Sequence, residues 1–328
     1  MRIFANAHYD FIRWRWYAMA LSLLVVTAGL VMIFTRGLPL GIDFTGGTIV
    51  ILKFEKPVAE DDVRRALEPL PGEKVVQQYG EPASNEILIR LPQVGEERGA
   101  SLEEGGRQAL AQIEKAGVGA FEVRSLESVG PVIGADLQRK AVYATIASIL
   151  GIMAYIALRF RFSFAVGAIA ATLHDVLVVV AFLTFFGYEL SLNIVAAILA
   201  ITGYSVNDTI VIFDRVRENL RSMRRDSLTQ VVNTSVNQTL GRTLITAGTT
   251  FLAVLSLYVF GGEVLRGFAF AMLVGVVSGT YSTVYIASAI AIVVSGRRRG
   301  TRTTAAAAPA TEPAPRRAGK SGRNVRVS

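Results

Sequence analysis

Cysteine is absent from the 328 residues, which excludes disulfides, thiolate metal ligands and cysteine nucleophiles. Only two histidines occur, His8 and His174, so we expect no metal site, and no motif for a cofactor is visible. Charged residues make up 18% of the chain, below the roughly 25% of a soluble domain. Hydrophobic residues make up 52%, and the mean hydropathy is +0.43. These values predict a membrane protein without a metal or a cofactor.

The net charge of +8 is unevenly distributed along the chain. Residues 36–136 carry 17 acidic and 11 basic side chains, a net charge of −6, which leaves +14 for the rest. A nucleic-acid-binding protein has its basic residues clustered on one face or stripe. The observed split suits the two sides of a membrane better, so we expect contact with membrane lipid and no specific nucleic acid.

Six apolar runs are each long enough to cross the hydrocarbon core of a bilayer, which is about 30 Å thick. They are Tyr17–Phe34, Ala141–Leu158, Phe164–Phe186, Leu192–Phe213, Leu244–Phe260 and Phe268–Val294. The first has a longer apolar core than a cleavable signal peptide and lacks a small-residue cleavage site. We therefore expect a retained anchor at 17–34 and a five-helix membrane region at 139–296.

Arginine-rich and acidic connections alternate between these runs, and this alternation predicts the topology. The positive-inside rule places both termini in the cytoplasm and the acidic segment on the outer side of the membrane. Residues 1–16 then form a cytoplasmic N-terminal segment, and the arginine-flanked stretch 215–242 is expected to form a surface helix. The tail 297–328 is basic and lacks apolar periodicity, so we expect it to be disordered. Its contact with anionic lipid or ribosomal RNA is the alternative.

The segment 35–138 has the pattern of a small α+β domain between spans one and two. Its strands are expected at 42–54, 74–79, 86–91 and 120–126, and its helices at 59–67 and 101–115. Ser101 and Glu104 have the spacing of a capping box at the start of the second helix. The order β-α-β-β-α-β is the ferredoxin-like pattern. The fold class is thus a polytopic α-helical membrane protein with six transmembrane helices and an extracytoplasmic ferredoxin-like domain.

Asp208 lies within the fourth apolar run, where an ionised carboxylate costs about 2.5–3.5 kcal/mol at the centre of a helix. Arg242 begins the fifth run from the same side of the membrane and can reach a similar depth. One interpretation is a buried ion pair that fixes helix packing. The other is a protonatable switch, because burial and a nearby guanidinium act in opposite directions on the proton affinity of a carboxyl group.

Other polar residues cluster in the same spans. Ser205 is three residues before Asp208 and shares its helical face. His174-Asp175 lies in mid-membrane in the third span, either as a structural hydrogen-bonded pair or as a proton relay. Several small residues in these spans favour close helix packing. These are Gly203, Gly248, Gly275, Ser278 and Gly279.

Two segments resemble signatures of the SecD/SecF family. Gly41 to Thr48 (GIDFTGGT), just after the first span, is similar to a signature of the family, and Gly203 to Thr209 (GYSVNDT) is similar to its fourth-span motif. Asp214-Arg215 beyond the second segment, His174-Asp175 and the stretch from Arg242 to Thr246 also match. The signature residues are Gly41, Asp43, Phe44, Gly46, Gly47, Asp214 and Arg215. The resemblance covers roughly residues 8–296.

The resemblance implies a proton-coupled, non-enzymatic accessory subunit of the Sec protein export machinery, with a membrane fold of the resistance-nodulation-division type. Its partners would be SecD, the SecYEG translocon, the small accessory subunit YajC and an unfolded preprotein. In the family, the residues that match Asp208 and Arg242 are proton-path residues. We extend the predicted proton pathway to four polar neighbours: Asp175, His174, Ser205 and Asn207. Asp43 is expected to fix the backbone near the double glycine.

Two other functions make different demands on the sequence. A proton-coupled small-molecule exporter of the same superfamily would need a large pocket in the outer domain, for which about 100 residues offer little room. An intramembrane enzyme would need a nucleophile with its base, paired catalytic acids or a metal triad, and the sequence shows none of these motifs.

Overall fold

The computed structural model describes residues 8–72, 74–80, 84–92 and 100–296. Within them, six helices are long and apolar enough to cross a membrane, by length and composition. The helices are α1 (Arg15–Arg36), α5 (Pro131–Arg159), α6 (Phe162–Phe186), α7 (Leu192–Ser222), α8 (Leu228–Phe260) and α9 (Gly262–Ser282), the last continued by the π-helix η3 (Thr283–Ala287). The predicted number of spans is confirmed. The tail 297–328, predicted to be disordered, lies outside the described residues.

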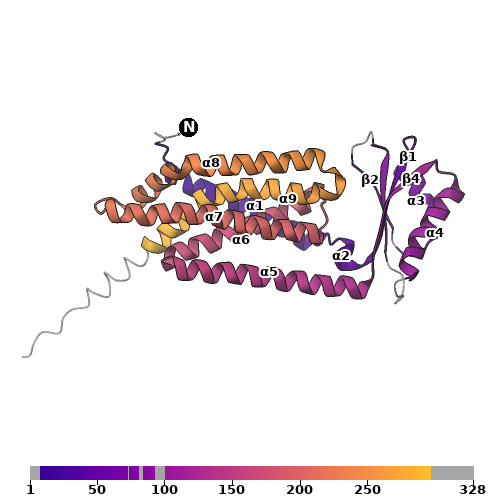
Figure 1. Cartoon of the computed structure of the whole chain (residues 1–328), viewed down its shortest axis with the longest axis horizontal. Coiled ribbons are helices and arrows are strands. Elements are labelled where there is room, and N and C mark those ends of the chain that lie inside the picture. Colours follow the sequence, from indigo (N-terminus) through magenta and orange to yellow (C-terminus); the bar gives the residue numbers. More distant parts are fainter. Residues whose placement is uncertain (1–7, 73, 81–83, 93–99, 297–328) are drawn as a thin grey trace, which may run out of the picture.

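Helices α7 and α8 are longer than the apolar runs that predicted them. The end of α7 is at Ser222, and Ser227 caps α8 through a capping box with Gln230. The stretch 215–242 therefore continues these two helices and their tight turn, and the separate surface helix predicted there does not form. The α7–α8 hairpin projects beyond the α5–α6 turn, at the end of the bundle opposite the sheet (Figure 1).

The four-stranded sheet lies at the other end of the bundle. Its strands β1 (Gly47–Phe54), β2 (Val75–Tyr79), β3 (Glu86–Leu91) and β4 (Phe121–Val129) are all antiparallel, in the order β2-β3-β1-β4. Helices α3 (Glu60–Ala66) and α4 (Ala100–Ala116) share one core with the sheet. Alternate residues of β1, such as Val50 and Leu52, are fully buried in that core. This is the predicted ferredoxin-like arrangement.

Three local predictions in this domain were wrong. Residues Ile42–Thr45 form the short helix α2 instead of the start of a strand. Gly46 and Gly47 then have φ values of 74° and 122°, which favour glycine, so β1 begins only after this turn. Helix α4 already includes Ala100, so Ser101 lies inside its first turn and is not the N-cap. Strand β4 continues to Val129.

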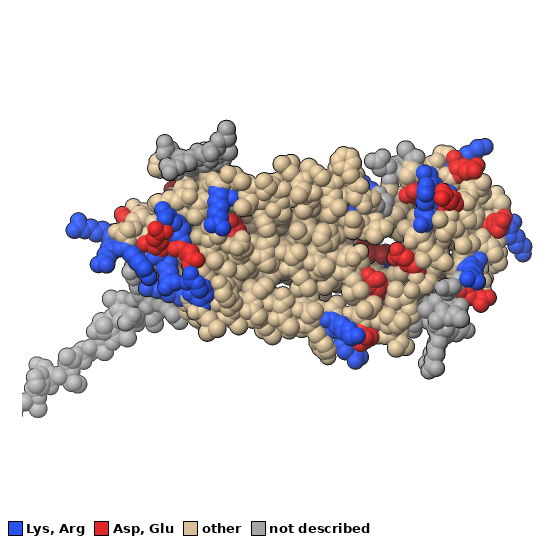
Figure 2. All heavy atoms as spheres, in the orientation of Figure 1, with Lys and Arg blue, Asp and Glu red and all other residues tan. Residues whose placement is uncertain are grey.

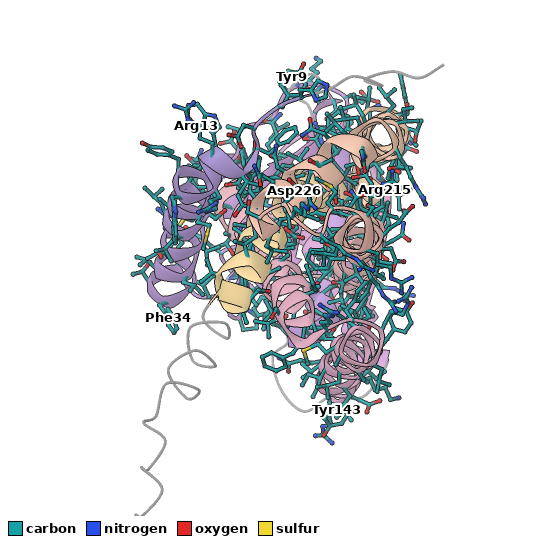
Figure 3. The ribbon with its side chains drawn as sticks, turned by 90° about the vertical axis from the view of Figure 1, so that its left-hand side faces the viewer. Tyr9, Arg13, Phe34, Tyr143, Arg215 and Asp226 are labelled. Atoms are coloured by element: carbon teal, nitrogen blue, oxygen red, sulfur yellow. The ribbon has the colours of Figure 1, made fainter. Side chains whose placement is uncertain are left out.

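The outer helices of the bundle leave large apolar surfaces uncovered. Helix α5 is the least covered of the six, and α1 exposes Phe34. Viewed from the end away from the sheet, Phe34 on α1 and Tyr143 on α5 point outward from different sides of the bundle (Figure 3). The surface along the middle of the bundle is almost free of charged residues, whereas lysines and arginines dominate at the end away from the sheet and acidic and basic residues are mixed at the sheet end (Figure 2). This distribution is expected for helices that cross a bilayer.

Candidate functional site

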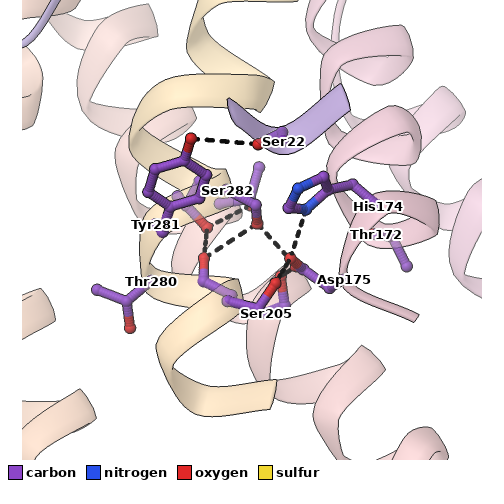
Figure 4. A network of polar contacts seen from close by, with 12 residues as sticks. Ser22, Thr172, His174, Asp175, Ser205, Thr280, Tyr281 and Ser282 are labelled. Atoms are coloured by element: carbon purple, nitrogen blue, oxygen red, sulfur yellow. Dashed lines mark hydrogen bonds and ion pairs between the residues drawn. The ribbon is translucent and has the colours of Figure 1, made fainter. Parts of the chain in front are cut away.

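Asp175, on α6, is the centre of a polar cluster inside the bundle. Three serine hydroxyls donate to its carboxylate: Ser205 on α7 at 2.5 Å, and Ser278 and Ser282 on α9 at 2.7 Å each. His174 Nδ1 lies 3.1 Å from Oδ1 of Asp175, the oxygen that also accepts from Ser278 (Figure 4). Asp175 is 1% exposed. The cost of burying this carboxylate is offset by hydrogen bonds from two neighbouring helices.

The cluster extends to α1 through Tyr281. The ring of Tyr281 lies 6.2 Å from that of His174, centre to centre. Its hydroxyl donates to the carbonyl oxygen of Ala18 at 2.6 Å and accepts from Ser22 Oγ at 3.2 Å (Figure 4). Polar groups therefore continue from α1 through α9 and α6 to α7. The structure brings together three predicted pathway residues here: His174, Asp175 and Ser205.

Asp208 lies one helical turn beyond Ser205 on α7 but contacts a different helix. Thr243 Oγ1, on α8, donates to its Oδ1 at 2.8 Å. Its Oδ2 is buried and has no hydrogen-bond partner among the described residues. Asp208 is 9% exposed. One oxygen of this carboxylate is thus held in place, and the other is free to take up a proton or to accept a new donor.

Arg242 precedes Thr243 on α8 and is exposed at the surface of the bundle. Its charge acts on Asp208, but no oxygen of an acidic group lies within 4.0 Å of its guanidinium among the described residues. The buried ion pair that the sequence left open is therefore not formed. Asn207 is also exposed and points away from the interior, so the structure separates it from the other predicted pathway residues.

Asp214 and Arg215 lie at the end of the bundle away from the sheet. Arg159 donates to Asp214 Oδ1 at 2.9 Å. Arg215 binds Glu218 at 2.5 Å and Gln238 at 2.6 Å. These contacts form a partly exposed network across α5, α7 and α8.

Sequence reasoning missed the partners on α9. Ser278 and Ser282 are four residues apart, so they share one face of a helix, and this spacing was the available signal. Helix α9 packs closely on α7 at Gly279, where an added Cβ atom would lie only 3.1 Å from Ser205 Cβ. The π-helix η3 follows directly, and Thr283 in it contacts Thr209 of α7 through their hydroxyls at 3.0 Å. Such π-helical turns are frequent at functional sites.

The segment with the double glycine is joined to the start of α7. Asp43 Oδ2 accepts a hydrogen bond from the backbone N–H of Leu192 at 2.8 Å. The N–H of Gly41 donates to the carbonyl oxygen of Leu190 at 2.8 Å. Asp43 was expected to fix the backbone of the double glycine, but its bond goes to the helix that carries Asp208.

A second connection joins the sheet to the same loop. Arg90, on β3, forms an ion pair with Glu189. Glu189 lies in the loop before α7, next to Leu190, whose carbonyl oxygen accepts from Gly41. Both side chains are largely buried. Burial lowers the pKa of the Arg90 guanidinium, but an arginine starts so far above neutral pH that it remains charged. The sheet and the segment that leads into it are thus bound at two points, one in the first turn of α7 and one in the loop before it.

The fold and this cluster define a class: a multi-span membrane protein with carboxylates buried inside its helix bundle and an α+β domain at one end. Within the described ranges, no three acidic, histidine or cysteine side chains are grouped to hold a metal ion. Residues 109–297 match the family model of the protein export membrane protein SecD/SecF, C-terminal region. Residues 31–58 match the SecD/SecF GG motif. The chain belongs to the SecD/SecF family.

Individual relatives agree with this assignment. The protein translocase subunit SecF of Escherichia coli O157:H7 is 41% identical over 291 residues, which cover 88% of this chain and 89% of that one. The protein of the same description from Calditerrivibrio nitroreducens is 42% identical over 285 residues, covering 85% and 91%.

The crystal structure of SecDF, a translocon-associated membrane protein from Thermus thermophilus, is similar with a TM-score of 0.79 at 37% identity. The match covers 91% of this chain but 40% of that one. The chain therefore spans about two fifths of the solved SecDF chain. None of these relatives is described as a small-molecule exporter.

Proposed function

We propose that this chain is a SecF-type subunit that uses proton flow, together with SecD, to promote a late stage of preprotein translocation across the bacterial inner membrane. It acts without enzymatic chemistry of its own, beside the SecYEG translocon and the small subunit YajC, on an unfolded preprotein. The observation that supports proton coupling is the Asp208 carboxylate, with one oxygen bound to Thr243 and the other buried without a partner.

Proton binding at Asp208 would change which surroundings of this side chain, and so which arrangement of the helices, are most stable. With a proton on Oδ2, the group is neutral and suits the apolar interior. Without it, the carboxylate needs a cation, and Arg242 is close on the neighbouring helix, with no ion-pair partner in the described part of the chain. The membrane potential supplies about 2.3 kcal/mol for each charge that crosses 100 mV. This energy is enough to shift a conformational equilibrium about fiftyfold.

Helix α7 would carry this change to the sheet domain. It is one continuous helix from Leu192 to Ser222, so a displacement near Asp208 moves its first turn as well. That first turn is bound by Asp43, and the preceding loop is bound by Arg90. A conformational change of the bundle can therefore reposition the domain that we propose lies outside the membrane, where it would contact the preprotein. Both termini would then lie in the cytoplasm.

A SecD partner would complete the pathway. Arg242 and Asn207 are polar and exposed on neighbouring helices at the depth of the membrane, where lipid is a poor environment for them. A second helix bundle packed there would bury them. In the SecDF chain, the segment that this protein matches is followed or preceded by other segments that make up three fifths of its length.

The test is the substitution Asp208→Asn in membrane vesicles that contain the SecD partner. Asparagine keeps an oxygen that can accept from Thr243, but it cannot take up and release a proton. We expect normal amounts of the complex and loss of the proton-dependent late step. Asp214→Asn is the matched control, because Asp214 is partly exposed and binds Arg159 at the bundle end. Full proton-dependent translocation by Asp208→Asn would refute the proposal.

A further inference from the structure

A cavity of about 1100 Å³ opens at the end of the bundle opposite the sheet. It lies between the α5–α6 turn, the projecting α7–α8 hairpin and the end of the last helix at Gly296. Figure 2 shows that Lys and Arg side chains gather at this end, and Figure 3 views the same end directly. None of the proposed proton-pathway residues lines this cavity.

Five arginines and one acidic residue line the cavity. The arginines are Arg159, Arg161, Arg217, Arg221 and Arg224, and the acid is Asp226. Asp214 neutralises Arg159 at 2.9 Å. No acidic oxygen lies within 4.0 Å of the guanidinium groups of the other four among the described residues. Asp226 lines the cavity at a greater distance from them, so the cavity carries a net positive charge.

The wall on the bundle side is apolar and aromatic. Phe213 contacts Phe160 and Phe164 with ring centres 6.0 Å and 5.0 Å apart, which makes this wall a packed surface. At its outer edge, Leu158 is 90% exposed. The cavity thus combines guanidinium groups that have no ion-pair partner in the described chain with apolar surface that leads onto the side of the bundle. Free phosphate or a nucleotide would use the first of these features but leave the second in contact with water.

The chain's own tail does not suit this cavity. Residues 297–328 contain nine Arg or Lys and a single acid, Glu312, so they would add positive charge to positive charge. Both the charge and the apolar wall are matched by a lipid with an anionic headgroup. Basic pockets at the ends of membrane helices bind such headgroups, and guanidinium groups bind phosphate through paired hydrogen bonds.

We propose that this cavity is a binding site for an anionic phospholipid. The phosphate lies among Arg161, Arg217 and Arg221, and an acyl chain runs along Phe160 and Leu158 onto the side of the bundle. The three arginines come from the α5–α6 turn and from the end of α7, so a bound lipid joins these two elements. It would hold the end of the helix that carries Asp208 at its middle.

The experiment compares lipid binding by the full chain, purified as a complex with its SecD partner, using dioleoyl phosphatidylglycerol and dioleoyl phosphatidylcholine. Native mass spectrometry with titrated lipid gives the ratio of affinities. The variant replaces Arg161, Arg217 and Arg221 by Gln. We expect it to bind phosphatidylglycerol about 100-fold more weakly, because each of the three basic residues near an anionic headgroup contributes about fivefold. Its binding of phosphatidylcholine should stay unchanged.

The matched control replaces three arginines away from this cavity by Gln: Arg64, Arg65 and Arg139. It changes the net charge equally and should bind phosphatidylglycerol as the parent does. Leu158→Gln should weaken the binding of phosphatidylglycerol but leave the binding of inorganic phosphate unaffected. The proposal is overturned if the parent binds both lipids equally, if both triple variants lose phosphatidylglycerol to the same extent, or if inorganic phosphate or an acidic peptide displaces the lipid completely at equal concentration.

Discussion

Helix α7 begins with two backbone N–H groups that are bound by side chains from different parts of the chain. Asp43, from α2, accepts from the N–H of Leu192 at 2.8 Å. Ser191, the N-cap residue, accepts from the N–H of Ile194 at 3.4 Å. Both bonds satisfy the free donors of a helix start. Only the bond from Asp43 also joins α7 to the segment that leads into the sheet.

Asp43→Ala and Ser191→Ala should therefore both reduce stability, Asp43→Ala somewhat more than Ser191→Ala. Loss of an N-cap acceptor costs about 0.5–2 kcal/mol. Asp43 also places a negative charge at the positive end of the helix, which contributes about 0.3–1 kcal/mol. The bond of Ser191 is longer, so we expect about 1.5 kcal/mol for Asp43→Ala and about 0.5–1 kcal/mol for Ser191→Ala. Thermal unfolding of each purified variant measures these losses.

The two variants should differ much more in function than in stability. If Asp43 transmits movement of α7 to the sheet, then Asp43→Ala uncouples the two and reduces proton-dependent translocation in vesicles. Ser191→Ala should leave translocation near the parent level. Asp43→Asn keeps an acceptor oxygen and should recover most of the activity. If translocation falls in proportion to stability in all three variants, Asp43 is a helix cap and nothing more, and the coupling argument fails.

Two further predictions concern the interior of the bundle. Asp175→Ala removes the acceptor of three serine hydroxyls and should destabilise the bundle by about 2 kcal/mol, whereas Ser282→Ala removes one bond and should cost about 0.6 kcal/mol, the average for such bonds in membranes. Equal unfolding midpoints of the two would show that the serines do not bind Asp175. Gly279→Ala places a methyl group 3.1 Å from Ser205 Cβ and should cost about 1 kcal/mol. At Gly203 an added Cβ atom has no neighbour within 4 Å, so Gly203→Ala should leave the stability of the isolated chain unchanged or raise it. A loss of stability as large as that of Gly279→Ala would contradict the close approach of α7 and α9.

Much of the fold could be predicted because it depends on local patterns. An apolar run of about 20 residues has few alternatives to a membrane helix, and the alternation in 86–91 has few alternatives to a strand. The order of those elements then selected the ferredoxin-like sheet. The errors lie at element ends, as at Ile42–Thr45, where the positive φ values of Gly46 and Gly47 delay the start of β1.

The candidate site was predictable only in part. The cost of an isolated charge in the membrane singled out Asp208 and Asp175 without any knowledge of their neighbours. The neighbours themselves depend on helix rotation and on the closeness of α7 and α9. For this reason Ser278, Ser282 and Thr243 were not identified as partners, and Asn207 was included although it faces outward.

By itself, the sequence determined which segments cross the membrane, which segment forms the sheet, and which acidic side chains need a special environment, because these properties follow from the composition and spacing of neighbouring residues. The tertiary structure decided which donors surround each carboxylate: three serines for Asp175, and Thr243 rather than Arg242 for Asp208. It also decided that Asp43 binds α7. These hydrogen bonds join residues 30 to 149 positions apart. They form only where packed elements bring the donor within about 3 Å of the acceptor, and no local pattern records that distance.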